Sequence, residues 1–188
     1  MWCLLLGAAG FLFCCLFDIN KVRWNIRFLN LFFVLGSFLL IFSTILCIFK
    51  GNFSIVTSNF GLYRILMLSG LILSVIAEIY ALFFALPFND TYMESEAVSV
   101  VDRGWYRACR HPGFWPLAFV YLFLWLFFSN ILLFYAFIVY TICNYIYIVI
   151  QDIYIFPKYI HGYDNYKKTV PFLLPTKDSI KHAFFNDF

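Results

Sequence analysis

The 188-residue sequence has few charged residues, only 12% of the chain, where an ordinary soluble domain has about a quarter. Apolar residues make up 64% of it, against about half in such a domain. A chain with so little charge is typical of a membrane protein and excludes an ordinary soluble domain. The net charge of +3 is small, and the basic residues form short clusters, which favours lipid headgroups over nucleic acid as partners.

Paired cysteine motifs are also missing from the sequence. None of the six cysteines forms a C-x-x-C pair, and five of them lie in apolar segments. This spacing disfavours both a disulfide framework and a zinc site, so no metal is expected. Cys109 stands apart, among arginines, and we interpret it as a small packing residue rather than a reactive thiol.

Long apolar segments are what the sequence has instead, and a membrane-spanning helix needs about 20 such residues. The candidates are Met1–Phe17, Phe28–Phe49, Gly61–Pro87 and Gly113–Ile150. The first lacks the basic start and the cleavage site of a signal peptide, so it is taken as a span. The last is too long for one span and has an adjacent polar pair, Ser129-Asn130, near its middle. It is predicted to form a helical hairpin, which gives an all-α, polytopic membrane bundle of about five transmembrane helices.

The lysines and arginines are divided unevenly between the two ends of these spans. If the C-terminus is cytosolic, eleven of the thirteen basic residues are cytosolic, and Lys50 and Arg64 lie outside. The positive-inside rule therefore predicts a multi-pass protein with a cytosolic C-terminal segment. We expect one membrane domain over 1–188, made of N-terminal transmembrane helices (1–88), a core (89–175) and a tail (176–188).

The densest basic cluster lies directly before the predicted hairpin, in the stretch "DRGWYRACRHPGFWPL" (102–117). Arg107, Arg110 and His111 precede Pro112, a residue that suits the first turn of a helix. The N–H groups and partial positive charge of the helix N-terminus add to these cations. This pattern predicts a site for a carboxylate or phosphate, which arginine binds through two hydrogen bonds. The alternative interpretation is a basic anchor at the membrane surface.

The segment after the hairpin reads "QDIYIFPKYIHGYDNYKKTVPFLLP" (151–175). Because an antiparallel hairpin brings its two ends together, Asp152 is predicted to lie close to Arg110 and His111. The site is therefore expected to contain acidic as well as basic side chains.

Three tyrosines of the same segment, Tyr159, Tyr163 and Tyr166, follow at spacings of four and three. Such spacings predict one face of a helix. We interpret the tyrosines either as an aromatic belt at the membrane surface or as a wall for a flat or cationic ligand.

Glu78 lies inside the third predicted span, and an acid within the membrane is a candidate functional residue. Arg64 is 14 positions away, about 21 Å along a helix, which is too far for an ion pair. Glu78 is close enough to the cytosolic end to reach Arg107 or Arg110, or to line a tunnel for a substrate. The alternative is a protonated or locally hydrogen-bonded helix residue.

The two polar segments resemble the isoprenylcysteine carboxyl methyltransferase and phospholipid methyltransferase superfamily of integral membrane enzymes. The first motif of that family reads approximately G-x-Y-x-x-x-R-H-P-x-Y-x-G. The residues that match it are Gly104, Tyr106, Arg110, His111 and Pro112. Phe114 and Pro116 stand where tyrosine and glycine are usual.

The second motif of the family reads roughly E-E-x-x-L and, after a gap, Y-x-x-Y-x-x-x-V-P. The residues that match the later part are Tyr163, Tyr166, Val170 and Pro171. Gln151 and Asp152 stand at the paired glutamates and Ile155 at the leucine. The resemblance covers about residues 100 to 175.

The resemblance implies S-adenosylmethionine as the methyl donor, bound between the cytosolic end of the hairpin and the C-terminal segment. The cofactor-binding residues that it implies, together with the chemistry of the side chains, are Tyr106, Arg107, Arg110, His111, Gln151, Asp152, Tyr163 and Tyr166. The catalytic candidates are Arg110, His111 and Glu78. The methyl acceptor is expected to enter sideways from the bilayer and to be an isoprenylcysteine, a phospholipid amine, or a small thiol or alcohol.

Two other functions compete with methyl transfer. Membrane sterol reductases that use NADPH have a similar C-terminal core, but they carry an H-x-N-Y-x-G-D-like run where this chain has "HPGFWPL". The replacement of the glutamate pair by Gln151-Asp152 raises a third possibility, a non-catalytic membrane scaffold related to these enzymes.

Overall fold

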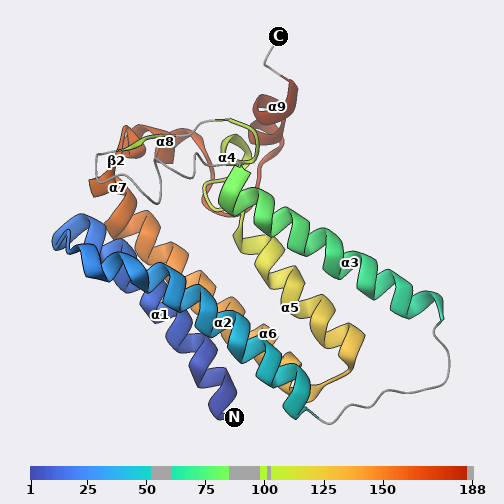
Figure 1. The fold of residues 1–188 in the computed structure, drawn as a ribbon. Coiled ribbons are helices and arrows are strands. Elements are labelled where there is room, and N and C mark those ends of the chain that lie inside the picture. The colour runs from blue at the N-terminus through green and yellow to red at the C-terminus, as the bar shows by residue number, and fades with distance from the viewer. Residues whose placement is uncertain (52–60, 85–97, 101–102, 186–188) are drawn as a thin grey trace.

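The computed structural model describes residues 1–51, 61–84, 98–100 and 103–185, and helices make up most of the described chain (Figure 1). The predicted all-α class is therefore confirmed. A short strand pair was not predicted: β1 (Val98–Ser99) and β2 (Ile160–His161) pair in parallel, with Val98 opposite Ile160. Pro87, at the predicted end of the third span, lies outside the described residues.

Within the described ranges, four helical segments are long and apolar enough to cross a membrane, which indicates a membrane protein. They are Trp2–Arg23, Arg27–Lys50, Leu62–Leu82 and Ile131–Tyr159. The first contains helix α1 (Trp2–Arg23), six residues longer at its end than predicted. The second is a 3₁₀ turn (Arg27–Asn30) followed by α2 (Leu31–Lys50). The third is α3 (Leu62–Ile79), which continues as a π-helical turn (Tyr80–Phe84).

The predicted hairpin is formed by α5 (Phe114–Phe128) and α6 (Ile131–Ile150), and the chain reverses at Ser129-Asn130 as predicted. Ser129 has a left-handed backbone with φ of 50°, which ends α5. The Asn130 side chain then accepts a hydrogen bond from the Leu132 N–H at 2.8 Å and caps α6. Helix α5 has 15 residues, about 22 Å, and is therefore shorter than the ~30 Å apolar core of a bilayer.

The helices pack side by side in the order α2, α1, α6, α5 and α3 (Figure 1). Helices α1 and α2 approach closely at Gly10 and Gly36, where a Cβ on Gly10 would lie 2.7 Å from the Gly36 carbonyl oxygen. Small residues at such a crossing let two helix backbones pack directly against each other. The core of the bundle lies around Tyr140 and Leu133 of α6, both fully buried.

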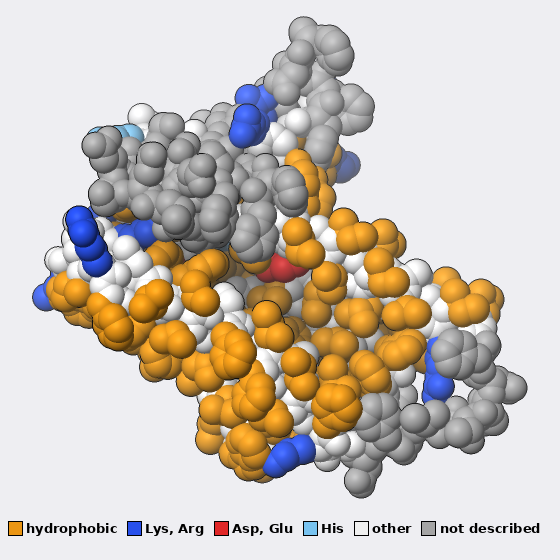
Figure 2. All heavy atoms as spheres, viewed as in Figure 1, with side chains coloured by type: hydrophobic (Ala, Val, Ile, Leu, Met, Phe, Trp, Pro, Cys, Tyr) orange, Lys and Arg blue, Asp and Glu red, His pale blue; other side chains and the backbone are white. Residues whose placement is uncertain are grey.

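The short elements gather at one end of the bundle (Figure 1). They are α4 (Trp105–Ala108), a π-helical turn that extends α6 (Gln151–Ile155), α7 (Phe156–Tyr159), α8 (Tyr163–Thr169) and α9 (Lys177–Phe185). The basic end of α1 and the 3₁₀ turn lie at this end too. Figure 2 shows a broad hydrophobic surface between basic side chains at its two ends, the pattern expected of a protein that crosses a bilayer.

Candidate functional site

The backbone of the segment before α5 turns at Gly104. Gly104 has φ of 54°, a conformation that glycine adopts without strain, and α4 starts directly after it. After α4 the backbone is extended at Cys109, and the Arg110 N–H donates to the Pro171 carbonyl at 2.9 Å. This backbone bond joins the first motif segment to the second. Helix α5 begins at Phe114, two residues after Pro112.

Arg110 and Asp152 form a two-point ion pair between the two ends of the hairpin. Arg110 Nε donates to Asp152 Oδ1 at 2.7 Å and Nη2 donates to Oδ2 at 3.2 Å. Both side chains are buried, with 9% and 6% of their surface exposed. The prediction that Asp152 lies close to Arg110 and His111 is therefore confirmed. The antiparallel hairpin is the physical reason, because it returns residue 152 to the level of residue 110.

The guanidinium of Arg110 has further partners on α8 and directly after it. Its Nη1 donates to the carbonyls of Lys167 at 3.1 Å and Val170 at 2.6 Å. With the two bonds to Asp152, these bonds use all but one of the N–H donors of a guanidinium. Arg110 is thus mainly a positioning residue, which holds α8 and the end of α6 together.

Asp152 has two more donors besides Arg110, and a histidine lies beside them. Tyr163 donates its hydroxyl to Oδ1 at 2.6 Å, and Lys167 places its ammonium 3.1 Å from Oδ2. The fourth neighbour, His111, has its Nε2 3.4 Å from Oδ1. Lys167 was not predicted as a site residue, although it follows Tyr163 by four positions and so lies on the same face of α8.

His111 is enclosed by aromatic rings. It stacks on Phe156 with centroids 5.7 Å apart and meets the edge of Phe172 at 5.1 Å. Its Nε2 is buried and makes no hydrogen bond within the described part of the chain. Burial lowers the pKa of His111 below its ordinary value; the Asp152 carboxylate opposes this shift, and the cations Arg110 and Lys167 add to it. The imidazole is therefore neutral at pH 7 and has one unused polar atom inside the site.

Tyr163 and Tyr166 are buried and Tyr106 is half-buried, and all three are bonded to protein groups. Tyr166 donates its hydroxyl to the Tyr106 carbonyl, and Tyr106 donates to the Ala81 carbonyl at 3.2 Å. The predicted single face of Tyr159, Tyr163 and Tyr166 is wrong. Helix α7 ends at Tyr159, and the left-handed Gly162 (φ 81°) separates it from α8, which carries the other two.

Burial and hydrogen bonding also affect two other groups of this region. The pKa of Tyr163 lies above its ordinary value because burial and its bond to the Asp152 carboxylate both favour the neutral hydroxyl. Burial raises the pKa of the Cys109 thiol to about 11. Cys109 is therefore protonated at neutral pH, in agreement with its interpretation as a packing residue.

Gln151 points to a different part of the bundle from Asp152. Its Nε2 donates to Asp18 Oδ2 of α1 at 2.8 Å, and the Tyr147 hydroxyl donates to the same oxygen at 2.7 Å. Successive residues of a helix point about 100° apart, so neighbours in sequence reach different helices. Gln151 and Asp18 thus form a second polar contact, between α6 and α1. Asp18 was not singled out from the sequence, where it is one acid near the end of an apolar run.

The two remaining predicted residues lie on α4 and α3. Arg107 is in the last turn of α4, half-buried, three residues before Arg110. Glu78 is in the last turn of α3, and its Oε2 lies 3.8 Å from the position of a Cβ on Gly113, at the start of α5. The predicted reach of Glu78 to Arg110 is not observed, because Arg110 is bonded to Asp152 and the α8 carbonyls.

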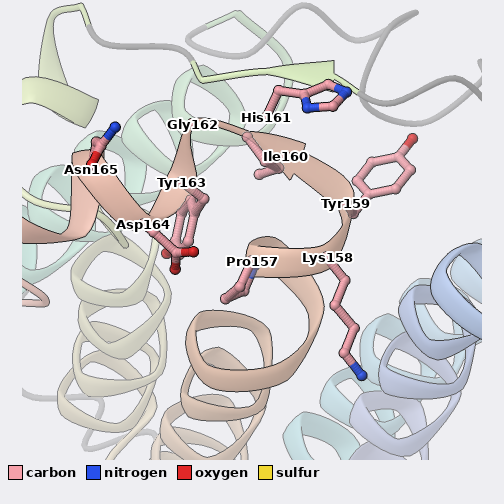
Figure 3. Close-up of a pocket in the computed structure, with 9 residues that line it drawn as sticks. All are labelled: Pro157, Lys158, Tyr159, Ile160, His161, Gly162, Tyr163, Asp164 and Asn165. Atoms are coloured by element: carbon pink, nitrogen blue, oxygen red, sulfur yellow. The ribbon is translucent and has the colours of Figure 1, made fainter.

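A surface pocket of about 390 Å³ adjoins this cluster of charged side chains. It is lined by the consecutive residues 157–165, where the chain passes from α7 through β2 to α8 (Figure 3). Tyr163 lines the pocket and also bonds Asp152. Figure 3 shows Lys158 extending toward the N-terminal helices, and its ammonium lies over the Tyr154 ring at 3.6 Å.

Comparison of the chain with protein-family models, with curated proteins and with solved structures finds no match in any of the three.

Proposed function

We propose that this chain is an integral membrane methyltransferase that uses S-adenosylmethionine. The observation that supports it best is the meeting of the two motif segments around Asp152. Arg110 and His111 come from the first segment and Tyr163 from the second, and all three lie within 3.4 Å of Asp152 Oδ1. Segments that are about 40 residues apart in the sequence thus form one buried polar cluster at the end of the hairpin.

The charges of this cluster suit the carboxylate of the cofactor. Arg110 and Lys167 are two cations that face one carboxylate, Asp152, so one net positive charge is left while His111 is neutral. A buried excess of positive charge favours the binding of an anion. Lys167, the remaining N–H of Arg110 and the nearby Arg107 are the groups we assign to the cofactor carboxylate.

The uncharged part of the cofactor also has partners. The unused Nε2 of His111 is a polar atom available to a ligand. The pocket lined by 157–165 adjoins Tyr163 and offers room for a nucleoside. Aromatic faces such as Trp105, whose ring meets Tyr80 at 5.2 Å, attract the positive sulfur. The donor set therefore fits S-adenosylmethionine, which when bound supplies an electrophilic methyl group.

Two predicted cofactor ligands have different roles in this proposal. Arg110 positions Asp152 and α8, since most of its N–H donors are used by the protein. Gln151 holds α6 against α1 through Asp18. The protein's contribution to the reaction is then mainly positioning and the exclusion of water, which is what a methyl transfer by in-line displacement requires.

The proposed orientation places this site at the cytosolic surface, with the C-terminal segment. The eleven basic residues assigned to that side belong to the last turn of α1 and to the loops and short elements that gather at this end of the bundle. A lipidic acceptor then reaches the site from the bilayer, and the cofactor reaches it from the cytosol.

Calorimetry on the detergent-purified protein tests the proposal. S-adenosylhomocysteine is expected to bind the wild type, and His111→Gln is expected to weaken binding at least about tenfold because a buried polar contact is lost. Lys50→Gln is the control, since Lys50 is exposed at the end of α2, at the opposite end of the bundle from the site. Retained helicity by circular dichroism shows that each variant is folded.

Three other outcomes of the same experiment contradict the proposal. Binding of NADPH without binding of S-adenosylhomocysteine assigns the chain to the membrane reductases. A folded protein that binds neither nucleotide is a scaffold. Equal binding by His111→Gln and the wild type removes the Asp152 cluster as the cofactor site.

A further inference from the structure

Cys3 of α1 and Cys47 of α2 are two buried cysteines at the end of the bundle opposite the candidate cofactor site. Their exposed fractions are 1% and 0%, and both belong to the same hydrophobic cluster. They are 44 positions apart in the sequence, and both are free thiols in the structure. The proposed methyl transfer uses neither of them.

The register of the antiparallel helices α1 and α2 is fixed by two close backbone contacts. A Cβ on Gly10 would lie 3.2 Å from the backbone nitrogen of Leu40. A Cβ on Gly36 would lie 3.1 Å from the backbone nitrogen of Cys14. Four residues forward along α1, from Gly10 to Cys14, thus correspond to four residues back along α2, from Leu40 to Gly36.

The same register brings the two cysteines opposite each other. Seven residues before Gly10 is Cys3, and seven residues after Leu40 is Cys47, a distance of about two helical turns on each helix. The Ser43 hydroxyl, one turn before Cys47, donates to the Cys3 carbonyl at 2.6 Å. The Cys47 thiol is close enough to the Cys3 thiol and to the Ser43 hydroxyl to interact with both.

The backbones of the two helices are unusually close over this stretch. A disulfide joins residues whose Cα atoms are about 4.4–6.8 Å apart, whereas the axes of ordinary helix pairs are about 8–10 Å apart. At Gly36 an added Cβ would lie only 2.6 Å from the Gly10 carbonyl oxygen. A serine side chain is short, so the bond from Ser43 to the Cys3 backbone shows that the helices are still close at the level of the cysteines.

The cysteines lie at the end of the bundle that the proposed orientation places outside the cytosol. Figure 1 shows the start of α1 and the end of α2 together, opposite the end where the short elements gather. The Lys50 ammonium lies over the Trp2 ring at 4.0 Å, and these two residues directly flank the cysteine pair on its outer side. Compartments outside the cytosol are oxidising, so disulfides form and persist there, whereas cytosolic thiols are kept reduced.

We propose that Cys3 and Cys47 are a redox pair, which a disulfide-bearing oxidant outside the cytosol converts into a disulfide. One cysteine thiolate attacks a sulfur of the oxidant, and the other thiolate then displaces that sulfur from the mixed disulfide. The two cysteines lose two electrons and two protons, and the oxidant leaves as two thiols. Because the pair is buried once α1 and α2 have packed, the exchange takes place before the packing of their outer ends is complete.

The disulfide has a structural consequence for the N-terminal half of the bundle. It closes a loop that contains most of α1 and α2, which restricts the unfolded chain and favours the packed helix pair. The cysteine spacing in the sequence gave no sign of this pairing, because two whole helices separate the thiols. The inference rests on the proposed orientation of the chain and is independent of methyl transfer.

Differential alkylation of the protein from expressing cells tests the pair. The cells are quenched with acid before lysis, and free thiols are blocked with N-ethylmaleimide in denaturant. The protein is then reduced and treated with deuterated N-ethylmaleimide, and mass spectrometry of its peptides measures both labels. Cys3 and Cys47 are expected to carry mainly the deuterated label. Cys109, at the cytosolic end of the bundle, is the internal control and should carry the light label.

Cys3→Ser identifies the partner, and Cys14→Ser is its matched control because Cys14 also packs on α2. The deuterated label at Cys47 should be lost in Cys3→Ser and retained in Cys14→Ser. A non-reduced digest of the wild type should contain one pair of peptides linked through Cys3 and Cys47.

Two results overturn the redox pair. The first is a light label at both cysteines of the wild type, which shows that they stay reduced in the cell. The second is a deuterated label that remains at Cys47 in Cys3→Ser, which shows that Cys47 has another partner. The wild-type measurement requires no substitution, so it decides the question even where Cys3→Ser fails to fold.

Discussion

The guanidinium of Arg110 and the carboxylate of Asp152 join the two ends of the α5–α6 hairpin, with Nε 2.7 Å from Oδ1 and Nη2 3.2 Å from Oδ2. The same guanidinium donates hydrogen bonds to the carbonyl of Lys167 on α8 and to the carbonyl of Val170 directly after α8. One buried ion pair therefore connects three segments that are distant in sequence. The arrangement of the candidate site depends on this pair.

Asp152→Asn is expected to destabilise the protein by about 3–5 kcal/mol, because it leaves a buried Arg110 without its counter-ion. The change should lower the midpoint of thermal unfolding followed by tryptophan fluorescence in detergent. Asp164→Asn, on the exposed side of α8, should shift it little. Similar midpoints for the two variants would show that the ion pair does not hold the site together.

The free energy of unfolding of the protein is expected to fall as the pH drops below about 6.5, the ordinary pKa of histidine. Because the pKa of His111 is lowered in the folded protein, the unfolded chain takes up a proton first and is favoured. His111→Gln should make this fall shallower between about pH 8 and pH 5. An identical pH profile for the variant and the wild type would contradict the prediction.

Gly10→Ala should destabilise the bundle by about 1–3 kcal/mol, because the added Cβ would lie 2.7 Å from the Gly36 carbonyl oxygen. The Cβ is attached to the backbone of α1 and the oxygen belongs to the backbone of α2, so neither atom can move aside easily. Gly113→Ala is the control, since its nearest neighbour would be 3.7 Å away. The midpoints of thermal unfolding of the two variants are compared in the same detergent. A smaller decrease for Gly10→Ala than for Gly113→Ala would argue against the close crossing of α1 and α2.

Asn130→Ser should cost less than Asn130→Ala, which is expected to lose about 1–3 kcal/mol. The asparagine caps α6 through Oδ1, and its Nδ2 also donates to the Cys47 carbonyl of α2 at 2.9 Å. Serine can still cap the helix through its hydroxyl oxygen, and it loses the amide donor. Thermal unfolding of the two variants separates the contributions, and equal losses would mean that the cap adds nothing.

The orientation of the chain is testable by labelling introduced cysteines with a maleimide that does not cross membranes. Lys50→Cys should react in intact cells, whereas Asp178→Cys should react only after the membrane is permeabilised. Both positions are exposed, and the wild type measures the background from native cysteines. The opposite order of reactivity would reverse the proposed topology.

The apolar runs and the polar pair Ser129-Asn130 were enough to predict the hairpin and the approach of Asp152 to Arg110. Both predictions depend on the local pattern of apolar and polar residues. They also depend on the fact that a short connection between two helices makes them antiparallel. The tyrosine face was predicted wrongly, since the period of three and four assumed one helix through Gly162, where the backbone is left-handed. In the sequence, Gly162 alone was weaker evidence for a break in the helix than the three regularly spaced tyrosines were for a continuous one. In the structure, the backbone of Gly162 ends the first helix.

The sequence by itself determined which segments are apolar, where the chain turns and which polar segments meet, because period, length and turn residues act locally. Only the tertiary structure decided which side chains are partners. Gln151 and Asp152 are adjacent, yet one bonds Asp18, 133 positions away, and the other bonds Arg110. The packing and rotation of α6 against α1 and α5 set these contacts.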